Sequence, residues 1–173
     1  MDIIDVLIED HAVLRGEAEA LTAPFTRLLG GAKEIDRRAL LRDMRFFFTL
    51  FKTHEAVEDD FLSEAFCLVE LDARQRAAFT DGRRSLADAL SRFGSLAVDS
   101  GAKSVEAMRG VSLRLLDALE EHLSLEEKII FPRLKASLRA DMLRDVGERA
   151  RAEGSWAAAR SSVGPAAAAK FAR

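Results

Sequence analysis

The segment LLRDMRFFFTLFKTHEAVEDDFLSEA (residues 40–65) decides the fold of this chain. Its apolar residues recur at alternating steps of three and four, the spacing that places side chains on one face of an α-helix. We call such a row a seam, and this one consists of Leu40, Met44, Phe47, Phe51, His54, Glu58, Phe61 and Ala65. Two of its members, His54 and Glu58, are polar where a buried helix face normally carries Leu or Phe. The segment therefore predicts a long helix with ionisable side chains on its inner face.

Three more segments show the same spacing. Their seams are Ile4, Leu7, His11, Leu14, Ala18, Leu21, Phe25 and Leu28; Phe79, Arg83, Leu86, Leu90, Phe93 and Ala97; and Met108, Ser112, Leu115, Leu119, His122, Glu126 and Ile129. No stretch alternates apolar and polar residues with the period of two that a strand would show. The sequence therefore predicts an all-α protein in which four long helices share one interior.

Candidate helix ends separate these four segments. They fall at Gly30-Gly31, around Leu71-Asp72, near Ser100-Gly101 and after Phe131-Pro132. The segments between them have about 25 to 35 residues, well above the mean helix of ~11 to 12. Long helices joined by short connections pack as antiparallel neighbours. We therefore predict an up-down four-helix bundle over residues 1–135.

Single residues add local expectations. Pro24 lies within the first seam and predicts that the first helix kinks there or ends just before it. Asp36 is the predicted N-cap of the second helix, because its carboxylate can accept hydrogen bonds from the first free N–H groups. Gly82 lies inside the third helical pattern, where it marks either a close helix contact or a bend.

Residues 136–173 are predicted to form a C-terminal extension. Leu138, Met142 and Val146 have the spacing of a short fifth helix, and an Ala/Ser-rich, mildly basic tail follows. The first interpretation of this tail is a frayed or loosely docked end. The alternative is a docking or oligomerisation segment anchored by Trp156 or Phe171, through which the chain would form a homodimer or bind a protein partner.

Composition restricts the class of protein. Of 173 residues, 26 are Lys or Arg and 29 are Asp or Glu, so the formal net charge is −3 and nucleic acid is not expected as the main partner. A single cysteine, Cys67, excludes an internal disulfide framework and fits a reducing compartment. Acidic residues interrupt the N-terminal MDIIDVLIEDH, which fits neither a signal peptide nor a membrane span. We expect a cytoplasmic protein.

Five polar residues occupy seam positions: His11, His54, Glu58, His122 and Glu126. Burying a carboxylate costs several kcal/mol unless it is paired, hydrogen-bonded, protonated or bound to a metal. His54 and Glu58, like His122 and Glu126, are separated by four residues, which places both side chains on one helix face. Two such pairs on facing helices, with His11 on a third, predict a metal site in the interior.

Less specific interpretations apply to other residues. A His-Glu pair also occurs as a buried ion pair without metal, and a lone His such as His11 is more often a hydrogen-bonded core residue. Glu55, Asp59, Asp60, Glu121 and Glu127 are expected on solvated faces, with Glu127 a candidate acceptor behind a ligand. The phenylalanines Phe46, Phe47, Phe48 and Phe51 are expected to pack in the core and to give the site dry walls.

At these residues the sequence resembles the hemerythrin-like, HHE cation-binding family. The match comprises Asp10-His11, HEAVEDDFL (54–62) and HLSLEEKIIFP (122–132), and it covers residues 1–135. The resemblance implies a four-helix bundle that holds a non-haem di-iron centre. It also implies that His11 and His54 serve one iron and His122 the other, with Glu58 and Glu126 bridging the two.

One position departs from the family pattern. Many such domains carry a His on the third helix, whereas the seam residue here is Arg83, whose guanidinium cannot ligate a cation. Three hypotheses follow: a more open two-metal site, a single metal on the side of His11 and His54, or a metal-free interior in which Arg83 pairs with Glu58 or Glu126. The simpler possibility for Arg83 itself is that its long side chain extends outward and leaves the site unaffected.

The expected function is binding of non-haem iron, one or two ions per chain, with reversible binding or sensing of O₂, NO or peroxide. Iron is what the resemblance implies, because His and carboxylate ligands suit Mn and Zn equally well. The alternative is a metal-poor regulatory or interaction bundle in which Arg83 neutralises the buried carboxylates. The sequence shows no general acid/base pair and no substrate pocket, so it predicts no turnover reaction.

Overall fold

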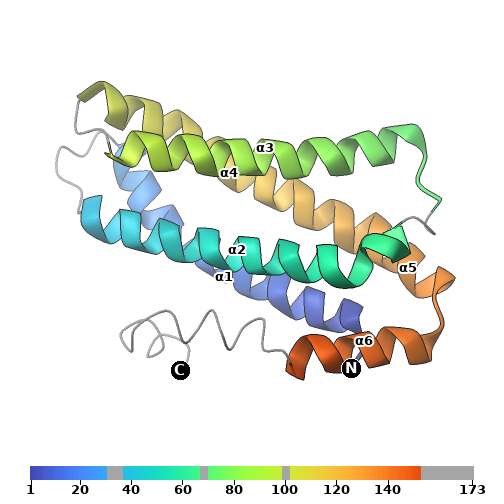
Figure 1. The fold of residues 1–173 in the computed structure, drawn as a ribbon. Coiled ribbons are helices and arrows are strands. Elements are labelled where there is room, and N and C mark those ends of the chain that lie inside the picture. Colours follow the sequence, from blue (N-terminus) through green and yellow to red (C-terminus); the bar gives the residue numbers. More distant parts are fainter. Residues whose placement is uncertain (31–36, 67–69, 99–101, 153–173) are drawn as a thin grey trace.

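The structure is a computed structural model that describes residues 1–30, 37–66, 70–98 and 102–152, and within these residues it is all-helical. Four long helices lie lengthwise beside one another, and shorter ones follow (Figure 1). They are α1 (Ile3–Leu29), α2 (Arg37–Phe66), α3 (Ala73–Val98), α4 (Ala102–Leu125), the π-helix η1 (Glu126–Ile130), α5 (Phe131–Ser137) and α6 (Ala140–Ala152). Among the described residues, no helix is both long and apolar enough to cross a membrane.

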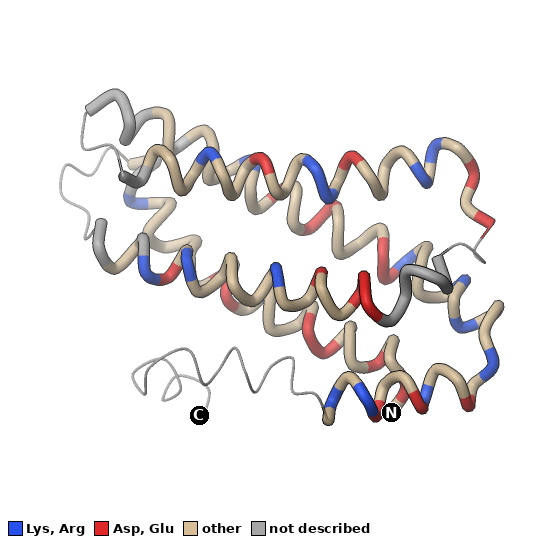
Figure 2. The backbone as a smooth tube through the Cα atoms, in the orientation of Figure 1, with Lys and Arg blue, Asp and Glu red and all other residues tan. Residues whose placement is uncertain are grey.

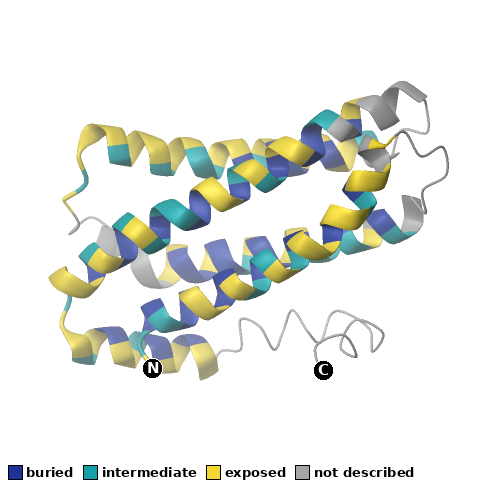
Figure 3. Ribbon diagram, turned by 180° about the vertical axis from the view of Figure 1, so that it is seen from behind, coloured by how far each residue is buried: buried dark blue, intermediate teal, exposed yellow. Residues whose placement is uncertain are grey.

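The interior is built from the predicted seams. Each long helix turns a buried stripe inward and an exposed stripe outward (Figure 3). Charges of both signs are interspersed along the outer faces of the helices (Figure 2). The larger core cluster joins all four long helices, with Phe25 of α1 packed on Phe93 of α3 at a ring-centroid distance of 5.5 Å. The structure does not describe the side chains of four seam residues: Leu28, Phe61, Ala65 and Ala97.

Three predicted helix ends agree with the structure, and the fourth is wrong. α1 runs through Pro24 and ends at Leu29, so the helix does not stop before the proline. After Phe131-Pro132 the chain stays helical to Ser137, with Pro132 in the first turn of α5 directly after the π-helix η1. The predicted N-cap Asp36 lies outside the described residues.

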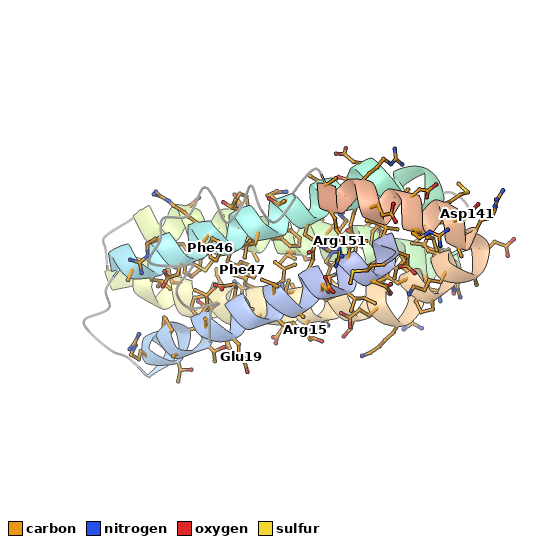
Figure 4. The ribbon with its side chains drawn as sticks, turned by 90° about the horizontal axis from the view of Figure 1, so that it is seen from below. Arg15, Glu19, Phe46, Phe47, Asp141 and Arg151 are labelled. Carbon is orange, nitrogen blue, oxygen red and sulfur yellow. The ribbon has the colours of Figure 1, made fainter. Side chains whose placement is uncertain are left out.

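The short fifth helix forms as α6, but its buried face differs from the prediction. Leu143, Gly147 and Ala150 are buried, whereas Met142 is 53 % exposed. The reason is the close approach of α6 to the start of the chain, since a Cβ on Gly147 would lie 2.7 Å from backbone atoms of Asp2 and Ile3. Arg151 of α6 also forms an ion pair with Glu9 of α1, and Figure 4 shows it beside that helix. The predicted anchors Trp156 and Phe171 lie outside the described residues.

Candidate metal centre

The structure brings together the five seam residues that the sequence singles out, and we call them the His/Glu cluster: His11, His54, Glu58, His122 and Glu126. None is more than 1 % exposed. Candidate ligand atoms fall into two groups, one of His11, His54 and Glu126 and one of Glu58, His122 and Glu126, and within each group they lie within 4.8 Å of one another. Glu126 belongs to both groups, so its carboxylate could provide an oxygen ligand to an ion in either one.

The closest contacts join imidazole nitrogens to one another and to Glu126. The Nε2 atoms of His11 and His54 are 3.1 Å apart, and His11 Nε2 is 3.2 Å from Glu126 Oε2. On the other side of the same carboxylate, His122 Nε2 is 3.0 Å from Glu126 Oε1. Glu58 is more distant, with Oε1 4.0 Å from His54 Nε2. Three nitrogen atoms therefore surround a single carboxylate in a space closed to solvent.

Carboxylates behind the imidazoles determine where their protons lie. His11 Nδ1 is 2.8 Å from Glu127 Oε1, and an ionised carboxylate can only accept, so His11 donates from Nδ1. His54 Nδ1 faces Asp10 Oδ2 at 3.7 Å, which favours the same tautomer. With His54 in that tautomer, both Nε2 atoms present lone pairs to each other at 3.1 Å, a contact that becomes favourable when both nitrogens bind one cation; with the hydrogen on Nε2 of His54, the same contact is a hydrogen bond. A carboxylate that orients the imidazole is the usual support of a metal-bound His.

Several buried polar atoms of the cluster lack a hydrogen-bond partner within the described part of the chain. They are Nδ1 of His54, both carboxylate oxygens of Glu58, both of Glu126 and both ring nitrogens of His122. The approach of His122 to Glu126 is close, but it does not have hydrogen-bond geometry. Each unsatisfied buried group costs about 1 to 3 kcal/mol. A bound cation would satisfy these oxygens and the Nε2 of His122 together.

Burial shifts the pKa values of four cluster residues, His11, His122, Glu58 and Glu126, toward the uncharged forms. It lowers the pKa of His11 to about 4, with a smaller effect from the nearby His54. It lowers the pKa of His122 to about 3. Burial also raises the pKa of Glu58, and burial together with the adjacent Glu58 raises that of Glu126 well above its usual value. Near neutral pH the imidazoles of His11 and His122 are therefore unprotonated and able to ligate, while a cation would displace carboxyl protons.

A π-helical turn places the acidic residues of the last motif. η1 begins at Glu126, and the N–H of Phe131 donates to the carbonyl of Glu126, five residues earlier. This wider turn lets Glu126 face the cluster while its neighbour Glu127 reaches His11. It also makes Ile130 a fully buried residue, where the sequence predicted Ile129. Single π-turns inside α-helices occur frequently at functional sites.

Glu127 connects the cluster to the surface. It is partly buried rather than on a fully solvated face, and it accepts from His11, the role for which it was a candidate. Arg15 donates to the same carboxylate from Nη1 at 2.6 Å and to Glu120 from Nε at 2.9 Å. Partial burial raises the pKa of Glu127, but the hydrogen bonds from Arg15 and His11 outweigh this effect and hold the pKa below its usual value. Figure 4 labels Arg15 on α1.

Arg83 forms ion pairs at the edge of α2 rather than inside the cluster. Its Nη1 is 2.9 Å from Asp59 Oδ1 and its Nε is 3.3 Å from Glu55 Oε1, whereas the metal-free hypothesis places it on Glu58 or Glu126. The expectation that Glu55 lies on a solvated face is wrong. Glu55 is only 7 % exposed, because Arg83 and Lys52 both contact its carboxylate.

The described residues of α3 present an apolar surface to His122. Phe79 stacks on the His122 ring at a centroid distance of 5.9 Å. A Cβ on Gly82 would lie 3.6 Å from His122 Nδ1, so Gly82 marks a close helix contact. In this structure the wall of the cluster next to α3 is therefore formed by an aromatic ring and a glycine, without a ligating atom.

Aromatic rings line the cluster, and one of them, Phe51, belongs to the four phenylalanines expected there. Phe51 meets the His122 ring edge-on at 6.1 Å, while Phe47 lies in the larger core and Phe48 is 40 % exposed. Figure 4 shows Phe46 and Phe47 side by side on α2.

Sequence reasoning missed two partners of the His/Glu cluster. Phe131 stacks on His11 at a centroid distance of 5.3 Å, and Asp10 is a buried carboxylate facing His54. The signal for Asp10 was its position next to His11 in the first motif. Phe131 directly precedes Pro132, where the sequence predicts the end of a helix.

No family model, no curated protein and no solved structure matches the chain.

Proposed function

We propose that α1–α4 form an up-down four-helix bundle of hemerythrin-like type, which binds non-haem iron and interacts reversibly with O₂, NO or peroxide. The resemblance of the three motifs supports the family, and the geometry of the His/Glu cluster supports a metal. The fold, the metal and the ligand are parts of one proposal, because the bundle interior is where the candidate ligands meet.

A single observation carries this proposal. The Nε2 atoms of His11 and His54 face each other at 3.1 Å, and the Nδ1 of each faces a carboxylate. Without a cation, and with both imidazoles carrying their hydrogen on Nδ1, this arrangement sets two lone pairs against each other beside the buried carboxylate of Glu126. A divalent cation makes every one of these contacts favourable, which explains why the fold tolerates so many polar groups in its interior.

In this proposal each of the two groups of candidate ligands binds one ion. His11, His54 and Glu126 would hold one ion, and Glu58, His122 and Glu126 the other. Bound iron would supply an open coordination position for a diatomic or peroxide ligand. Phe51, Phe79 and Phe131 keep water from the imidazoles by covering their faces and edges, and Glu127 holds His11 in its ligating tautomer.

Metal analysis of protein purified without a chelator and without a histidine tag tests the proposal. We expect two ions per chain in the parent protein and fewer in His122→Ala, which removes the only nitrogen of the second group. Ser112→Ala is the matched control, because Ser112 is also fully buried on α4 but its hydroxyl donates to the carbonyl of Met108. Absorption spectra before and after addition of NO or peroxide then report the ligand.

The opposite results would contradict the proposal. A parent chain that takes up no iron, manganese or zinc after reconstitution favours the alternative of a metal-free interaction bundle. Equal metal content in His122→Ala and the parent would show that the second group binds no ion. Spectra unchanged by NO and by peroxide in the iron-loaded protein would remove the proposed ligands while leaving the metal site.

A further inference from the structure

A groove of about 600 Å³ lies between α2 and α3, and none of the residues of the His/Glu cluster lines it. It opens because α3 packs mainly against α4 and makes much less contact with α2. In Figure 1, α3 runs lengthwise above α2 at the front of the view.

Apolar side chains form the floor of the groove and part of its wall. Met44 from α2 and Leu90 and Phe93 from α3 are buried beneath it, and Phe48 is a large apolar side chain left 40 % exposed at its edge. On the opposite wall Gly94 provides space, because a Cβ there would meet no atom within 4 Å. The groove therefore has room and an apolar surface for a chain or ring.

Two cations stand on the α2 wall. Arg45 and Lys52 both line the groove, about 10 Å apart along the helix at ~1.5 Å per residue. Lys52 Nζ lies 5.9 Å from the centre of the Phe48 ring and 2.8 Å from Glu55 Oε2, whereas the Arg45 guanidinium has no ion-pair partner among the described residues. No carboxylate belongs to the lining. Within the described residues, Arg45 therefore supplies the unpaired positive charge at the rim, above an apolar floor.

We propose that this groove binds an amphipathic anion, a small molecule with an apolar chain and one carboxylate. The chain lies over Phe93 and Leu90 beside Gly94, and the carboxylate faces Arg45. The volume is within the range of about 300 to 1,000 Å³ that is typical of small-molecule sites. The inference does not depend on the proposed metal function, since the two sites share no residue.

Isothermal titration calorimetry with dodecanoate, below its micelle concentration, tests the proposal. We expect one molecule per chain, with dodecyltrimethylammonium, which has the same chain and the opposite charge, binding at least about fivefold more weakly. Gly94→Leu should fill the groove and weaken dodecanoate binding by about tenfold or more. Arg45→Gln should weaken dodecanoate but leave the uncharged dodecanol unchanged.

Gly16→Leu is the matched control for Gly94→Leu. Both glycines lie in helices with open space around a Cβ, and leucine is the better helix former at both, so both variants should fold. Circular dichroism measures whether both variants fold. If Gly94→Leu does not fold, the comparison of dodecanoate and dodecanol binding by Arg45→Gln still tests the proposal. Equal dodecanoate binding by Gly94→Leu and the parent overturns the proposal. So does equal binding of the anion and the cation, or a parent dimer that Gly94→Leu dissociates, because the groove would then hold a second copy.

Discussion

His11 donates its Nδ1 hydrogen to Glu127 Oε1 over 2.8 Å, and this bond fixes which nitrogen of the imidazole faces the interior. Glu127 is itself held from the other side by Arg15, whose Nη1 is 2.6 Å from the same oxygen. The orientation of a buried candidate ligand is therefore set by a partly exposed ion pair. A substitution at the partly exposed Arg15 or Glu127 can therefore change the tautomer and orientation of the buried His11.

Removing the acceptor from His11 should weaken metal binding. We expect Glu127→Ala to lower metal affinity by about 10- to 100-fold, because the imidazole loses the group that holds its tautomer and raises its basicity. Glu127→Gln should cost less, since its amide oxygen can still accept. Competition with a chromophoric chelator measures the affinity. Glu120→Gln is the control, because Glu120 pairs with Arg15 without touching His11; equal losses in both variants would contradict the prediction.

The raised pKa of Glu126 predicts that Glu126→Gln stabilises the metal-free protein but weakens metal binding. In the metal-free protein this carboxyl stabilises the fold below its ordinary pKa, and that contribution is lost as the pH rises through the folded-state value. Glu126→Gln should therefore raise the melting temperature of chelator-treated protein at pH 8 and change it less at pH 5. In the metal-saturated protein the same variant should bind metal more weakly.

Thermal unfolding followed by circular dichroism measures the effect of Glu126→Gln. Glu121→Gln, at an exposed position of α4, should leave the melting temperature nearly unchanged at both pH values. A Glu126→Gln protein less stable than the parent at pH 8, with metal removed, would show that this carboxylate is stabilised by charge in the fold.

The lowered pKa values of His11 and His122 predict acid sensitivity. Each imidazole is held neutral in the fold, with a pKa of about 4 for His11 and about 3 for His122. Their contribution to stability is present above the ordinary value of about 6.5 and is lost as the pH falls toward these folded-state values. Metal-free His122→Phe should therefore lose less stability between pH 6.5 and pH 4 than the parent, as measured by urea unfolding. An identical loss in both proteins would contradict this.

Arg83 separates the metal-bound and metal-free interpretations of the interior. Since Arg83 pairs with Asp59 and Glu55, we expect Arg83→Gln to leave the metal content unchanged and to lower stability by about 1 kcal/mol or less. Arg83→His should add no further ion, because position 83 is directed to the edge of α2. Metal analysis of reconstituted protein provides the measurement, and a rise in metal content in either variant would support the arginine as a replacement for a cation.

Gly147 should tolerate no side chain. Its would-be Cβ lies 2.7 Å from the backbone of Asp2 and Ile3, so Gly147→Ala must push α6 from α1 and should cost about 1 to 3 kcal/mol of unfolding free energy. Gly16→Ala is the matched control on α1, where a Cβ meets nothing within 4 Å and the substitution should stabilise by up to about 1 kcal/mol. Urea unfolding compares the two, and equal effects would contradict the close contact.

The helices and the cluster could be predicted because both depend on periodicity. The spacing of three and four residues identified the inner face of each long helix, and polar residues on that face, such as His54 and Glu58, are costly enough to indicate a site. The fourth helix end was wrong because Pro132 signals a break locally, whereas the π-turn before it allows the helix to continue.

Other features depend on contacts between segments distant in sequence. The buried face of α6 follows from the approach of Gly147 to the first residues of the chain, which no local pattern indicates. The burial of Glu55 follows from two long cationic side chains, Lys52 and Arg83, that meet over it from different helices. The Lys52 contact is local to α2, whereas the Arg83 contact depends on the packing of α2 against α3 and cannot be read from either helix alone.

The glycine and phenylalanine that α3 places against His122 have a consequence for how such a protein can diversify. Since Gly82 and Phe79 contribute shape but no charge, their replacement would remodel the chamber around the proposed ion while sparing the residues proposed to hold it. Substitutions on α3 alone could thus change which ligand the site prefers, without changing the metal affinity that the proposed ligands on α1, α2, α4 and η1 would give.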